Sequence, residues 1–507
     1  MQVLGLAGAG SMFLGGSHLS AAAPNAINAA LASTDNDRIL VLIRLKGGND
    51  GLNTIVPLYD YDLYAQKRPT IRHQQQSLYN LSSNFGLPDS LKALQELWGE
   101  GAMKVAHGVG YPDQNLSHFR SADIWASGNN QQELDTGVLG RYFQDLYPDY
   151  LMDPPAEPTA IQIGSIGNLL FEGTDTNYAF TLNNPDQLAT VAENGKLHDL
   201  ANLPSCTYGS QLGFLRSTTN NTLAYAEVIN AAYENGSNTI EYGTDQLSRQ
   251  LSILAKIIKG GLRTQMYLVT LDGFDTHANQ VEIHNRLMQN LAEGVSNFYK
   301  DLEAGGHHDR VLSMTFSEFG RRIEENGSNG TDHGAASPVL IFGSGLEGNG
   351  FIGNHPDLSA PDDIGNLQYS TDFRSLYATV LKDWLCIDAP VVDALLPNGP
   401  YESKDLGFSC TSLSNPAFAN TTTFMHYASF QGDQTFINYE NNTHGRVKVE
   451  LYSMLGQKIE TLLDEVQTAG NKQINIKQNA ETTLFAGPYI YVITISGNRY
   501  SKKLILK

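Results

Sequence analysis

The sequence predicts an α/β sandwich followed by a small all-β sandwich. Three short apolar runs, at residues 39–45, 265–271 and 311–316, are rich in Val, Ile and Leu and are typical of buried parallel strands. Two amphipathic patterns with helical spacing, at 246–262 and 281–305, alternate with the second and third runs. The final part of the chain alternates apolar and polar side chains instead, which is typical of antiparallel strands.

Length and charge indicate where these parts divide. The 507 residues leave room for two or three domains, and the formal net charge is −20. Residues 411–507 hold 9 Lys and Arg against 7 Asp and Glu, whereas the first 410 residues hold 24 against 46. We therefore expect an export signal and lead-in at 1–37, an α/β domain at 38–410 and an all-β domain at 411–507. The acidic balance argues against nucleic acid as a partner, since phosphate contacts need a basic surface.

The N-terminal residues indicate export. An apolar stretch at 3–16 is followed by small residues, which predicts a secretory signal with cleavage near residues 21–23. The usual basic start is missing, so a wrong start codon explains the pattern, or the stretch is instead a buried helix. It is too short to cross a bilayer, and no other segment reaches transmembrane length. Cys386 and Cys410 could pair in an oxidising compartment, which would leave Cys206 over.

The remaining elements of the α/β domain follow from local patterns. Residues 24–37 form a polar lead-in. Residues 150–245 are rich in Asn, Thr, Gly and Pro, which predicts an irregular insertion that caps the rim of the sheet. The two amphipathic helices each end at a pair of glycines. Residues 370–386 predict the last helix of the domain.

Acidic and histidine side chains follow the three strand-like runs. They are Asp50 after the first run, Asp272, Asp275 and His277 after the second, and Glu318, Asp332 and His333 after the third. In open α/β sheets ligands bind beyond the carboxyl ends of the strands, so we expect these side chains to meet at one rim. Aspartate, glutamate and histidine together are the ligands of zinc, manganese or iron. The alternative is that they are helix caps and turn residues.

This arrangement predicts bound divalent metal. Either Asp272 or Asp275 would join His277 on one ion. Asp50 and Glu318 would hold a second. Two such ions clamp the attacking and leaving oxygens of a displacement at phosphorus or sulfur. Zinc, manganese, calcium and magnesium all remain open as the metal.

A second motif, YPDQNLSHFRSADIWASG, places Ser117 before a helical run at 118–126. A helix N-terminus favours an anion, and a hydroxyl there can bind a metal and attack a phosphoryl group. His118 is a candidate ligand, and Arg120 is a candidate partner of an oxyanion. The alternatives are an N-cap serine and two surface residues.

Arg321, beside Arg322, is another candidate for binding an anionic ester, through a bidentate contact. The alternative is a pair of surface cations near Glu324 and Glu325. The chain has no GxxxxGK motif, which argues against a nucleotide-binding P-loop, and no GxSxG motif, which argues against an α/β-hydrolase.

Five motifs in order resemble the DUF1501 family of bacterial exported proteins. They are RLKGGNDGLNTIVP, YPDQNLSHFRSADIWASG, TLDGFDTHANQ, TFSEFGRRIEENGSNGTDHGAASP and TDFRSLYATVLKDWL. The resemblance covers about residues 38–387. That family is similar to the alkaline phosphatase and sulfatase superfamily. The resemblance therefore implies an alkaline phosphatase-like α/β/α sandwich with a dimetal site at the strand ends.

The same resemblance implies roles for single residues. Asp50 matches the first-strand metal aspartate, and Ser117 matches the nucleophile or metal-ligand serine. Asp272 or Asp275, with His277, matches the aspartate–histidine pair of one metal. Glu318 matches a strand-end acid of the other metal, and His333 matches a late histidine before a strand. Phe319 departs from the pattern, since the superfamily commonly has a histidine directly after the strand-end acid.

The C-terminal part resembles the type A sorting domain of the type IX secretion system of Bacteroidota. The resemblance rests on NPAFANTTTFMHY, VKVELYSMLGQKIETL and the terminal GPYIYVITISGNRYSKKLILK. It implies an immunoglobulin-like sandwich, the type IX secretion machinery as a partner, and a secreted or outer-membrane surface location. The alternative is a carbohydrate-binding or adhesive sandwich.

Together these observations predict a secreted, metal-dependent hydrolase whose substrate is an anionic phosphate or sulfate ester. The alternative is a non-catalytic exported protein of the same fold that binds glycans or partners at the cell surface. The absence of a histidine after Glu318 favours the alternative.

Overall fold

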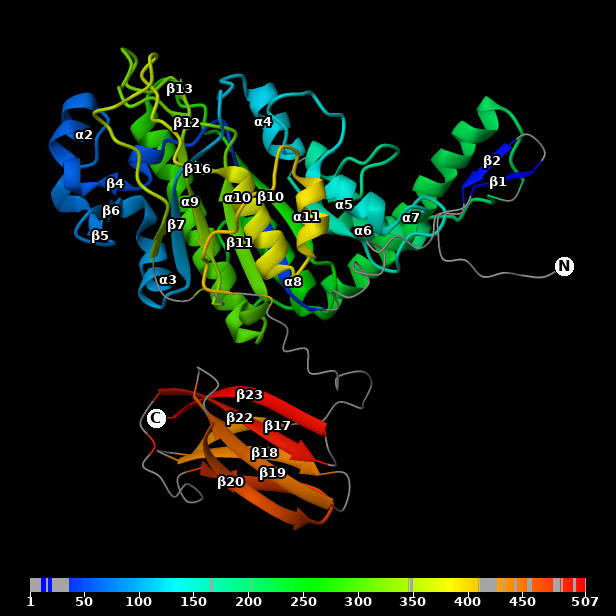
Figure 1. Cartoon of the computed structure of the whole chain (residues 1–507). Helices are drawn as coiled ribbons and strands as arrows, with labels where there is room; N and C mark the ends of the chain where they lie inside the picture. The colour runs from blue at the N-terminus through cyan, green and yellow to red at the C-terminus, as the bar shows by residue number, and fades with distance from the viewer. Residues whose placement is uncertain are drawn as a thin grey trace. The chain divides into compact units, whose positions relative to one another are not determined.

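The structure, a computed structural model, divides into two compact units, Met1–Cys410 and Thr411–Lys507 (Figure 1). The described residues are 11–14, 17–20, 36–408 apart from 165–166, 201, 345 and 347–349, residue 410, and 426–506 apart from 432–433, 442–444, 454–457, 477–483, 485–486 and 496–497. Most of the expected export signal, with its cleavage site, lies outside the described residues. Within it, β1 (Ser11–Leu14) and β2 (Ser17–Ser20) pair antiparallel.

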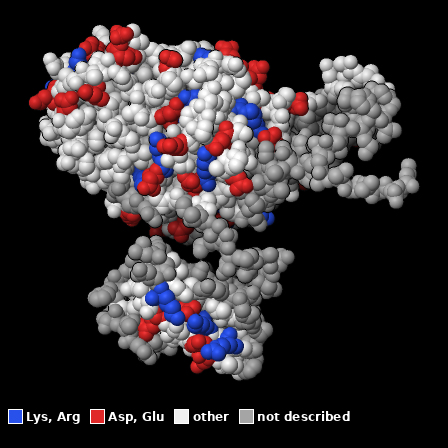
Figure 2. Space-filling model, viewed as in Figure 1, with Lys and Arg blue, Asp and Glu red and all other residues white. Residues whose placement is uncertain are grey.

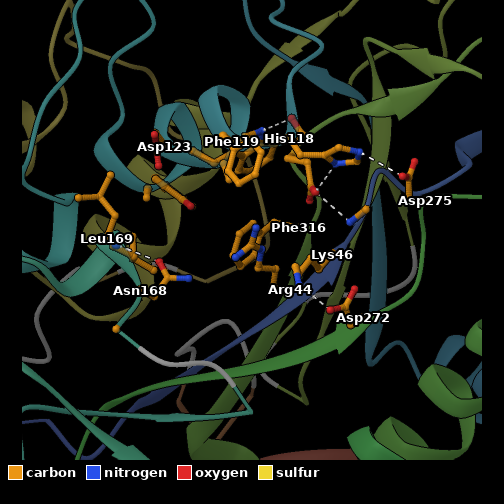
Figure 3. Close-up of a pocket in the computed structure, with 18 residues that line it drawn as sticks. Arg44, Lys46, His118, Phe119, Asp123, Asn168, Leu169, Asp272, Asp275 and Phe316 are labelled. Carbon is orange, nitrogen blue, oxygen red and sulfur yellow. Dashed lines mark hydrogen bonds and ion pairs between the residues drawn. The ribbon is translucent and has the colours of Figure 1, made fainter.

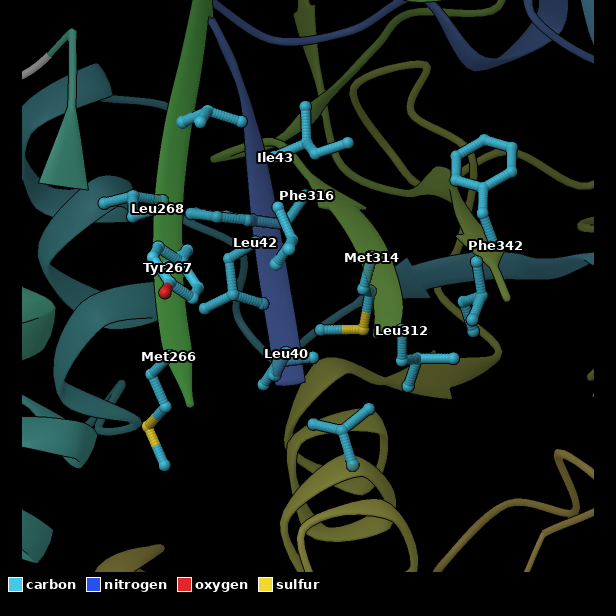
Figure 4. Packing of buried hydrophobic residues seen from close by; sticks show 14 of the residues in the cluster. Leu40, Leu42, Ile43, Met266, Tyr267, Leu268, Leu312, Met314, Phe316 and Phe342 are labelled. Carbon is cyan, nitrogen blue, oxygen red and sulfur yellow. The ribbon is translucent and has the colours of Figure 1, made fainter. Parts of the chain in front are cut away.

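A mixed sheet forms the centre of the first unit, in the strand order β15-β7-β14-β11-β3-β10-β8-β9. Its middle strands are β3 (Ile39–Lys46), β10 (Met266–Asp272) and β11 (Val311–Phe316), and β3 pairs in parallel with both others. These strands are the three apolar runs, so the prediction of buried parallel strands is confirmed. Leu42 and Leu268 are almost fully buried between the packed layers (Figure 4).

The outer strands give the sheet its mixed character. β14 (Ser337–Phe342) runs antiparallel to both β11 and β7 (Met103–Gly110). The edges are formed by β15 (Gly350–Ile352) and β16 (Thr371–Asp372), parallel to β7, by β8 (Ala160–Ile163), parallel to β10, and by β9 (Ala179–Leu182), parallel to β8. β7 was not predicted from the sequence, because Lys104, His107 and two glycines interrupt its apolar run.

Helices are present at the positions where the sequence predicts them in the first unit. α8 (Gln246–Lys259) is capped by Asp245, whose side chain accepts a hydrogen bond from the Ser248 N–H. α9 (Gln280–Ala304) follows β10, and α10 (Phe373–Thr379) continues as a π-helix over Val380–Trp384. The shorter helices are α2 (Tyr61–Lys67), α3 (Gln95–Gly99), α4 (His118–Ser127), α5 (Val138–Leu146) and α11 (Ala389–Leu395). Short sheets are formed by β4 (Val56–Pro57), β5 (Tyr79–Asn80) and β6 (Phe85–Leu87), and by β12 (Gly320–Arg321) and β13 (His333–Gly334).

The segment 150–245 is more regular than its composition predicts. Besides β8 and β9 it contains α6 (Pro185–Asn194) and the 29-residue α7 (Thr207–Asn235). The prediction of an irregular insertion was therefore wrong. α7 lacks a continuous apolar stripe, because its first half exposes large apolar side chains such as Leu215 and its buried apolar side chains all lie in its second half.

The second unit consists of two antiparallel sheets, in the orders β17-β18-β21 and β20-β19-β22-β23. Their strands are His426–Gln431, Gln434–Asn441, Gly445–Tyr452, Lys458–Gln467, Gly470–Asn475, Gly487–Ile495 and Asn498–Leu506, from β17 to β23. Ile437 and Ile474 of one sheet share a buried core with Val449 and Tyr491 of the other. The two sheets therefore pack face to face, as the alternating pattern predicts.

Two further observations concern the cysteines and the described helices. Cys386 and Cys410 form a disulfide bond, and Cys206 is free and exposed. A search of the described helices finds none with the length and apolar character of a membrane span.

Candidate metal centre

Three side chains from separate segments converge near the carboxyl ends of the central strands. One ligand atom from each of His118, Asp275 and His333 lies within 4.8 Å of the others. His118 is the first residue of α4, Asp275 lies in the loop after β10, and His333 opens β13. His277 adjoins them, because its Nε2 is 2.9 Å from His333 Nε2 and 3.1 Å from Asp275 Oδ1. The structure thus brings together four of the residues that the sequence singles out.

Close backbone approach positions these loops. Gly47 follows β3 with a φ of +123°, and a Cβ atom there would collide with the backbone of Phe274 and Asp275. A Cβ atom at Gly330 would collide in the same way with the backbone of His277. Glycine therefore lets the loops after β3, after β10 and before β13 pack backbone to backbone, which brings their donors to one place.

Two imidazoles are held so that their Nε2 atoms face each other. His333 Nδ1 donates to the Leu116 carbonyl at 2.8 Å. His277 Nδ1 donates to Asp332 Oδ1 at 3.2 Å. In the neutral rings each Nε2 therefore carries a lone pair. Two nitrogens at about 2.0–2.1 Å from one zinc ion lie roughly 3 Å apart, so this pair fits a shared cation.

Asp275 lies in the middle of this group. Its Oδ1 is 2.8 Å from Arg321 Nη2 and 3.2 Å from His333 Nε2, and its Oδ2 is 3.5 Å from His118 Nε2. Burial alone would raise the pKa of Asp275, but the hydrogen bond and charge of Arg321 hold that pKa below the ordinary aspartate value. The carboxylate is therefore an anion, and 49% of its side chain is exposed.

Glu318 supports His118 from behind. Its Oε1 accepts hydrogen bonds from the Gly47 N–H at 2.9 Å and from His118 Nδ1 at 3.0 Å. The bond to Glu318 raises the pKa of His118 above the ordinary histidine value. Its other oxygen, Oε2, and His118 Nε2 are both buried with no hydrogen-bond partner among the described residues. Phe319 packs its ring against His118 and His333, with centroids 4.8 and 4.5 Å apart, and forms an apolar wall.

Asp332 and Asp272 border the group without joining the triad. Asp332 holds His277 Nδ1 and also accepts from Asn326 Nδ2 at 3.2 Å, so it orients an imidazole. Asp272 forms an ion pair with Lys46 Nζ at 2.5 Å. Of the two aspartates that the sequence offers as the partner of His277, the one in contact is Asp275.

Asp50 has no contact with the group, which corrects its prediction as a metal ligand. Its Oδ1 and Oδ2 lie 2.8 and 2.6 Å from Arg68 Nη1, and Oδ2 also accepts from Gln280 Nε2. Asp50 and Arg68 are both fully buried. Burial alone would raise the pKa of Asp50, but Arg68 holds that pKa below its ordinary value. The oxygens of Asp50 therefore belong to a buried ion pair. The predicted second metal ion, held by Asp50 and Glu318, is not supported by this arrangement.

Arg321, Arg120 and Ser117 were expected to bind or attack an anionic ester, but their surroundings in the structure do not suit these roles. The Arg321 guanidinium is fully buried against backbone carbonyls and Asp275, so it does not face an ester. Arg120 donates to the Gln132 carbonyl at 3.0 Å. Ser117 is exposed, and its side chain makes no capping hydrogen bond. Neither Arg120 nor Ser117 lines the pocket beside the cluster.

That pocket has a volume of about 570 Å³, which is typical of small-molecule sites (Figure 3). His118 and Asp275 border one end, and Asn168 and Leu169 border the other. Segment 150–245 therefore reaches the rim, although only a short part of it does so. Among the described residues, the lining contains no serine, threonine or cysteine.

Two cations of this pocket, Arg44 and Lys46, were not predicted from the sequence. They lie two positions apart at the end of β3 and therefore project from one face of the sheet. A signal was available, because a charged residue inside an otherwise apolar strand needs a polar space to face.

Comparison with known proteins shows that part of this chain matches one family model and that its fold is similar to several solved structures. The family model described as "Protein of unknown function (DUF1501)" matches residues 210–389. No curated protein matches the chain. A protein in the alkaline phosphatase superfamily from Vibrio parahaemolyticus is 8% identical, with 81% of this chain and 76% of that chain covered and a TM-score of 0.32.

Two further solved structures are similar at the same level. The PsFucS1 sulfatase from Pseudoalteromonas sp. is 9% identical, with 89% and 86% covered and a TM-score of 0.32. The phosphonate monoester hydrolase SpPMH from Silicibacter pomeroyi is 8% identical, with 92% and 89% covered and a TM-score of 0.31. At such identities these are likenesses of fold alone, and the chemistry of the site rests on the residues of this chain.

Proposed function

We propose that this protein is a metal-dependent hydrolase of phosphate or sulfate esters. The observation that carries the proposal is the convergence of His118, Asp275 and His333 beside a pocket of about 570 Å³. Nitrogen and oxygen donors gathered beyond the carboxyl ends of parallel strands suit a metal centre that meets its ligand at that rim.

The residues of the cluster have separate parts in this proposal. His118, Asp275 and His333 would hold the ion, with His277 as a further donor. Glu318 and Asp332 would orient two of the imidazoles through their Nδ1 atoms. When bound, a divalent ion polarises an ester oxygen and stabilises the charge that develops on it. Several imidazoles favour zinc or manganese over calcium and magnesium, which prefer oxygen ligands.

Water is the nucleophile that this pocket favours. The described lining offers no hydroxyl or thiol other than the phenol of the buried Tyr377. Ser117, the nucleophile that the resemblance implies, has no contact that places it at the cluster. Glu318 is the buried carboxylate nearest to His118, and its unpartnered Oε2 is an acceptor for a proton released on attack.

A second candidate is a non-catalytic protein that binds a ligand through the same ion. The observation that favours it is the lack of a side-chain nucleophile in the described lining, together with the apolar wall formed by Phe319. Both candidates require a bound metal, and they differ in whether an ester is turned over.

Metal analysis of the purified full chain, followed by assays with 4-nitrophenyl phosphate and 4-nitrophenyl sulfate, tests both candidates. We expect a divalent ion in the wild type, its loss in His333→Ala, and turnover of one ester that is lost with the ion. His198→Ala, which removes an exposed histidine outside the cluster, is the matched control and should keep the metal. A metal-containing protein that turns over neither ester would support the binding candidate, and a metal-free wild type would exclude both.

We also propose that the protein is exported, with the type IX secretion machinery as its partner. The disulfide between Cys386 and Cys410 supports an oxidising compartment, and the two-sheet architecture of 411–507 suits a sorting module. Deletion of 411–507 should retain the protein inside the cell, as measured by fractionation of cells and medium. Unchanged export of the truncated chain would contradict this proposal.

A further inference from the structure

Arg44 is a cation with no partner in the described part of the chain. It lies near the end of β3, in register with Thr270 of β10 and Phe316 of β11, so it shares a sheet face with Phe316 in the pocket. No hydrogen bond or ion pair joins its guanidinium to another described residue. Its neighbour on the same face, Lys46, is instead neutralised by Asp272.

The hydroxyl of Tyr377 is the second unused group. Tyr377 lines the same pocket from α10, is 4% exposed, and its hydroxyl has no hydrogen-bond partner among the described residues. Burial raises the pKa of this phenol despite the nearby charge of Arg44, so the hydroxyl remains a donor. An unpaired buried donor has a free-energy cost that a ligand can remove.

Aromatic side chains separate these donors from the cluster. Phe119 follows His118 on α4 and is 85% exposed, an unusual degree for a large apolar side chain that borders a pocket. Phe316 and Trp125 stack on each other with ring centroids 5.7 Å apart and line the same pocket. Figure 3 shows Phe119 and Phe316 in the middle of the view, with Arg44 below them and Asp275 at the opposite side from Asn168. These rings offer faces for a cyclic group between the two polar ends.

We propose that Arg44 and Tyr377 form a second anion subsite, which binds a carboxylate, sulfate or phosphate on the substrate other than the ester at the metal. This inference rests on the proposed function and narrows its substrate class to ring-bearing esters with an additional anionic substituent. The guanidinium and the phenol together supply N–H and O–H donors, from which an oxyanion accepts hydrogen bonds.

The surrounding charge explains why such a subsite matters. The chain has a net charge of −20, and acidic side chains gather over the region of α2 on the face shown in Figure 2. Asp123 also lines the pocket, and burial raises its pKa above the ordinary value, although Arg120 and Arg44 oppose this. An anionic ligand is therefore repelled by most of the protein, and an unpaired arginine inside the pocket offers a local attraction.

The test compares probes that differ by one carboxylate and cannot be hydrolysed at their phosphonate. Calorimetry would measure the binding of phenylphosphonate and of 3- and 4-carboxyphenylphosphonate to the full chain as purified. We expect the better carboxylated probe to bind at least about tenfold more tightly than phenylphosphonate, as a hydrogen bond to a charged group allows. Arg44→Met should remove this gain, and Tyr377→Phe should reduce it, with both variants folded by thermal melting.

Two controls separate this inference from the proposed function. Arg216→Met changes the net charge equally at a half-buried position of α7, outside the pocket, and should leave the gain intact. His333→Ala should weaken all probes alike and leave the ratio between them, because it acts on the phosphonate end. Equal affinities of all probes in the wild type, or a gain that survives Arg44→Met, would overturn the subsite. Phenylphosphonate binding that is indifferent to His333→Ala would instead count against the metal centre.

Discussion

Two regions near the same rim of the sheet contain the same residue types but differ in their role. One is a buried structural network, and the other is an open cluster that suits a metal ion. The first is the closed network of Asp50, Arg68, Gln280 and His284, which is fully buried. The second is the open cluster around His118, Asp275, His277 and His333. Every charge in the closed network has a partner inside the protein. In the open cluster, Nε2 atoms face each other and half of the central carboxylate is exposed.

The difference lies in how the carboxylate is compensated. Arg68 contacts both oxygens of Asp50 and Gln280 donates to one of them, so buried donors already engage both oxygens. Arg321 contacts only one oxygen of Asp275 and leaves the other toward His118. An aspartate at a strand end is therefore a ligand or a structural ion pair depending on which arginine reaches it, and arginines arrive from distant parts of the chain.

Breaking the closed network should produce the largest effect. Arg68→Met leaves the Asp50 charge buried and unpaired, which should lower the free energy of unfolding by about 3–5 kcal/mol. Denaturant titration of the full chain would measure the change. The matched control is Lys46→Met, which breaks an ion pair whose side chains are 48% and 51% exposed, and it should cost at most about 1 kcal/mol. Equal effects of the two variants would show that the network is not the buried ion pair described here.

Acid should weaken the closed region through His284. Burial lowers the pKa of His284 in the folded protein to about 4, below the ordinary value of 6.5. Between these pH values the unfolded chain binds more protons, so stability falls as the pH falls from about 6.5 to about 4, by up to about 3 kcal/mol for this group. His284→Gln keeps a donor for Asn49 and should flatten the pH dependence of the unfolding free energy. If the unfolding free energy of this variant depends on pH as steeply as that of the wild type, His284 is not the group responsible.

Metal removal should act on the open region alone. A ligand at about one hundred times its dissociation constant stabilises the folded state by about 2.7 kcal/mol. Chelation should therefore lower the melting temperature of the wild type and leave that of His333→Ala unchanged. Re-addition of zinc or manganese should restore the wild type only. The same chelator shift in both proteins would indicate that any bound ion lies elsewhere.

The sequence was a good guide where one local pattern decided the outcome. The apolar runs at 39–45, 265–271 and 311–316 became adjacent parallel strands, because continuous apolar character requires burial on both faces. It failed for α7, whose first half is exposed, and for β7, whose run is interrupted. In both, packing against the rest of the unit outweighs local composition.

The site was predictable only in part, for a different reason. Residue type and position beyond strand ends identified Asp275, His277 and His333, and a helix start identified His118. The structure brings these residues together. The same reasoning failed for Asp50, because nothing local to Asp50 shows that Arg68 will contact it. Partners formed across long sequence separations are what decide between a ligand and an ion pair, and spacing alone does not reveal them.

The smallest expected effect concerns Ser117, the residue for which resemblance and structure differ most. Its side chain is exposed, makes no capping hydrogen bond and does not line the pocket, so Ser117→Ala should change the unfolding free energy by no more than about 0.5 kcal/mol. With water as the nucleophile, metal content and ester turnover should also stay at the wild-type level. A variant that keeps its metal but loses turnover would place the nucleophile at Ser117, and would mean that the start of α4 moves toward His118 and Asp275 when a substrate binds.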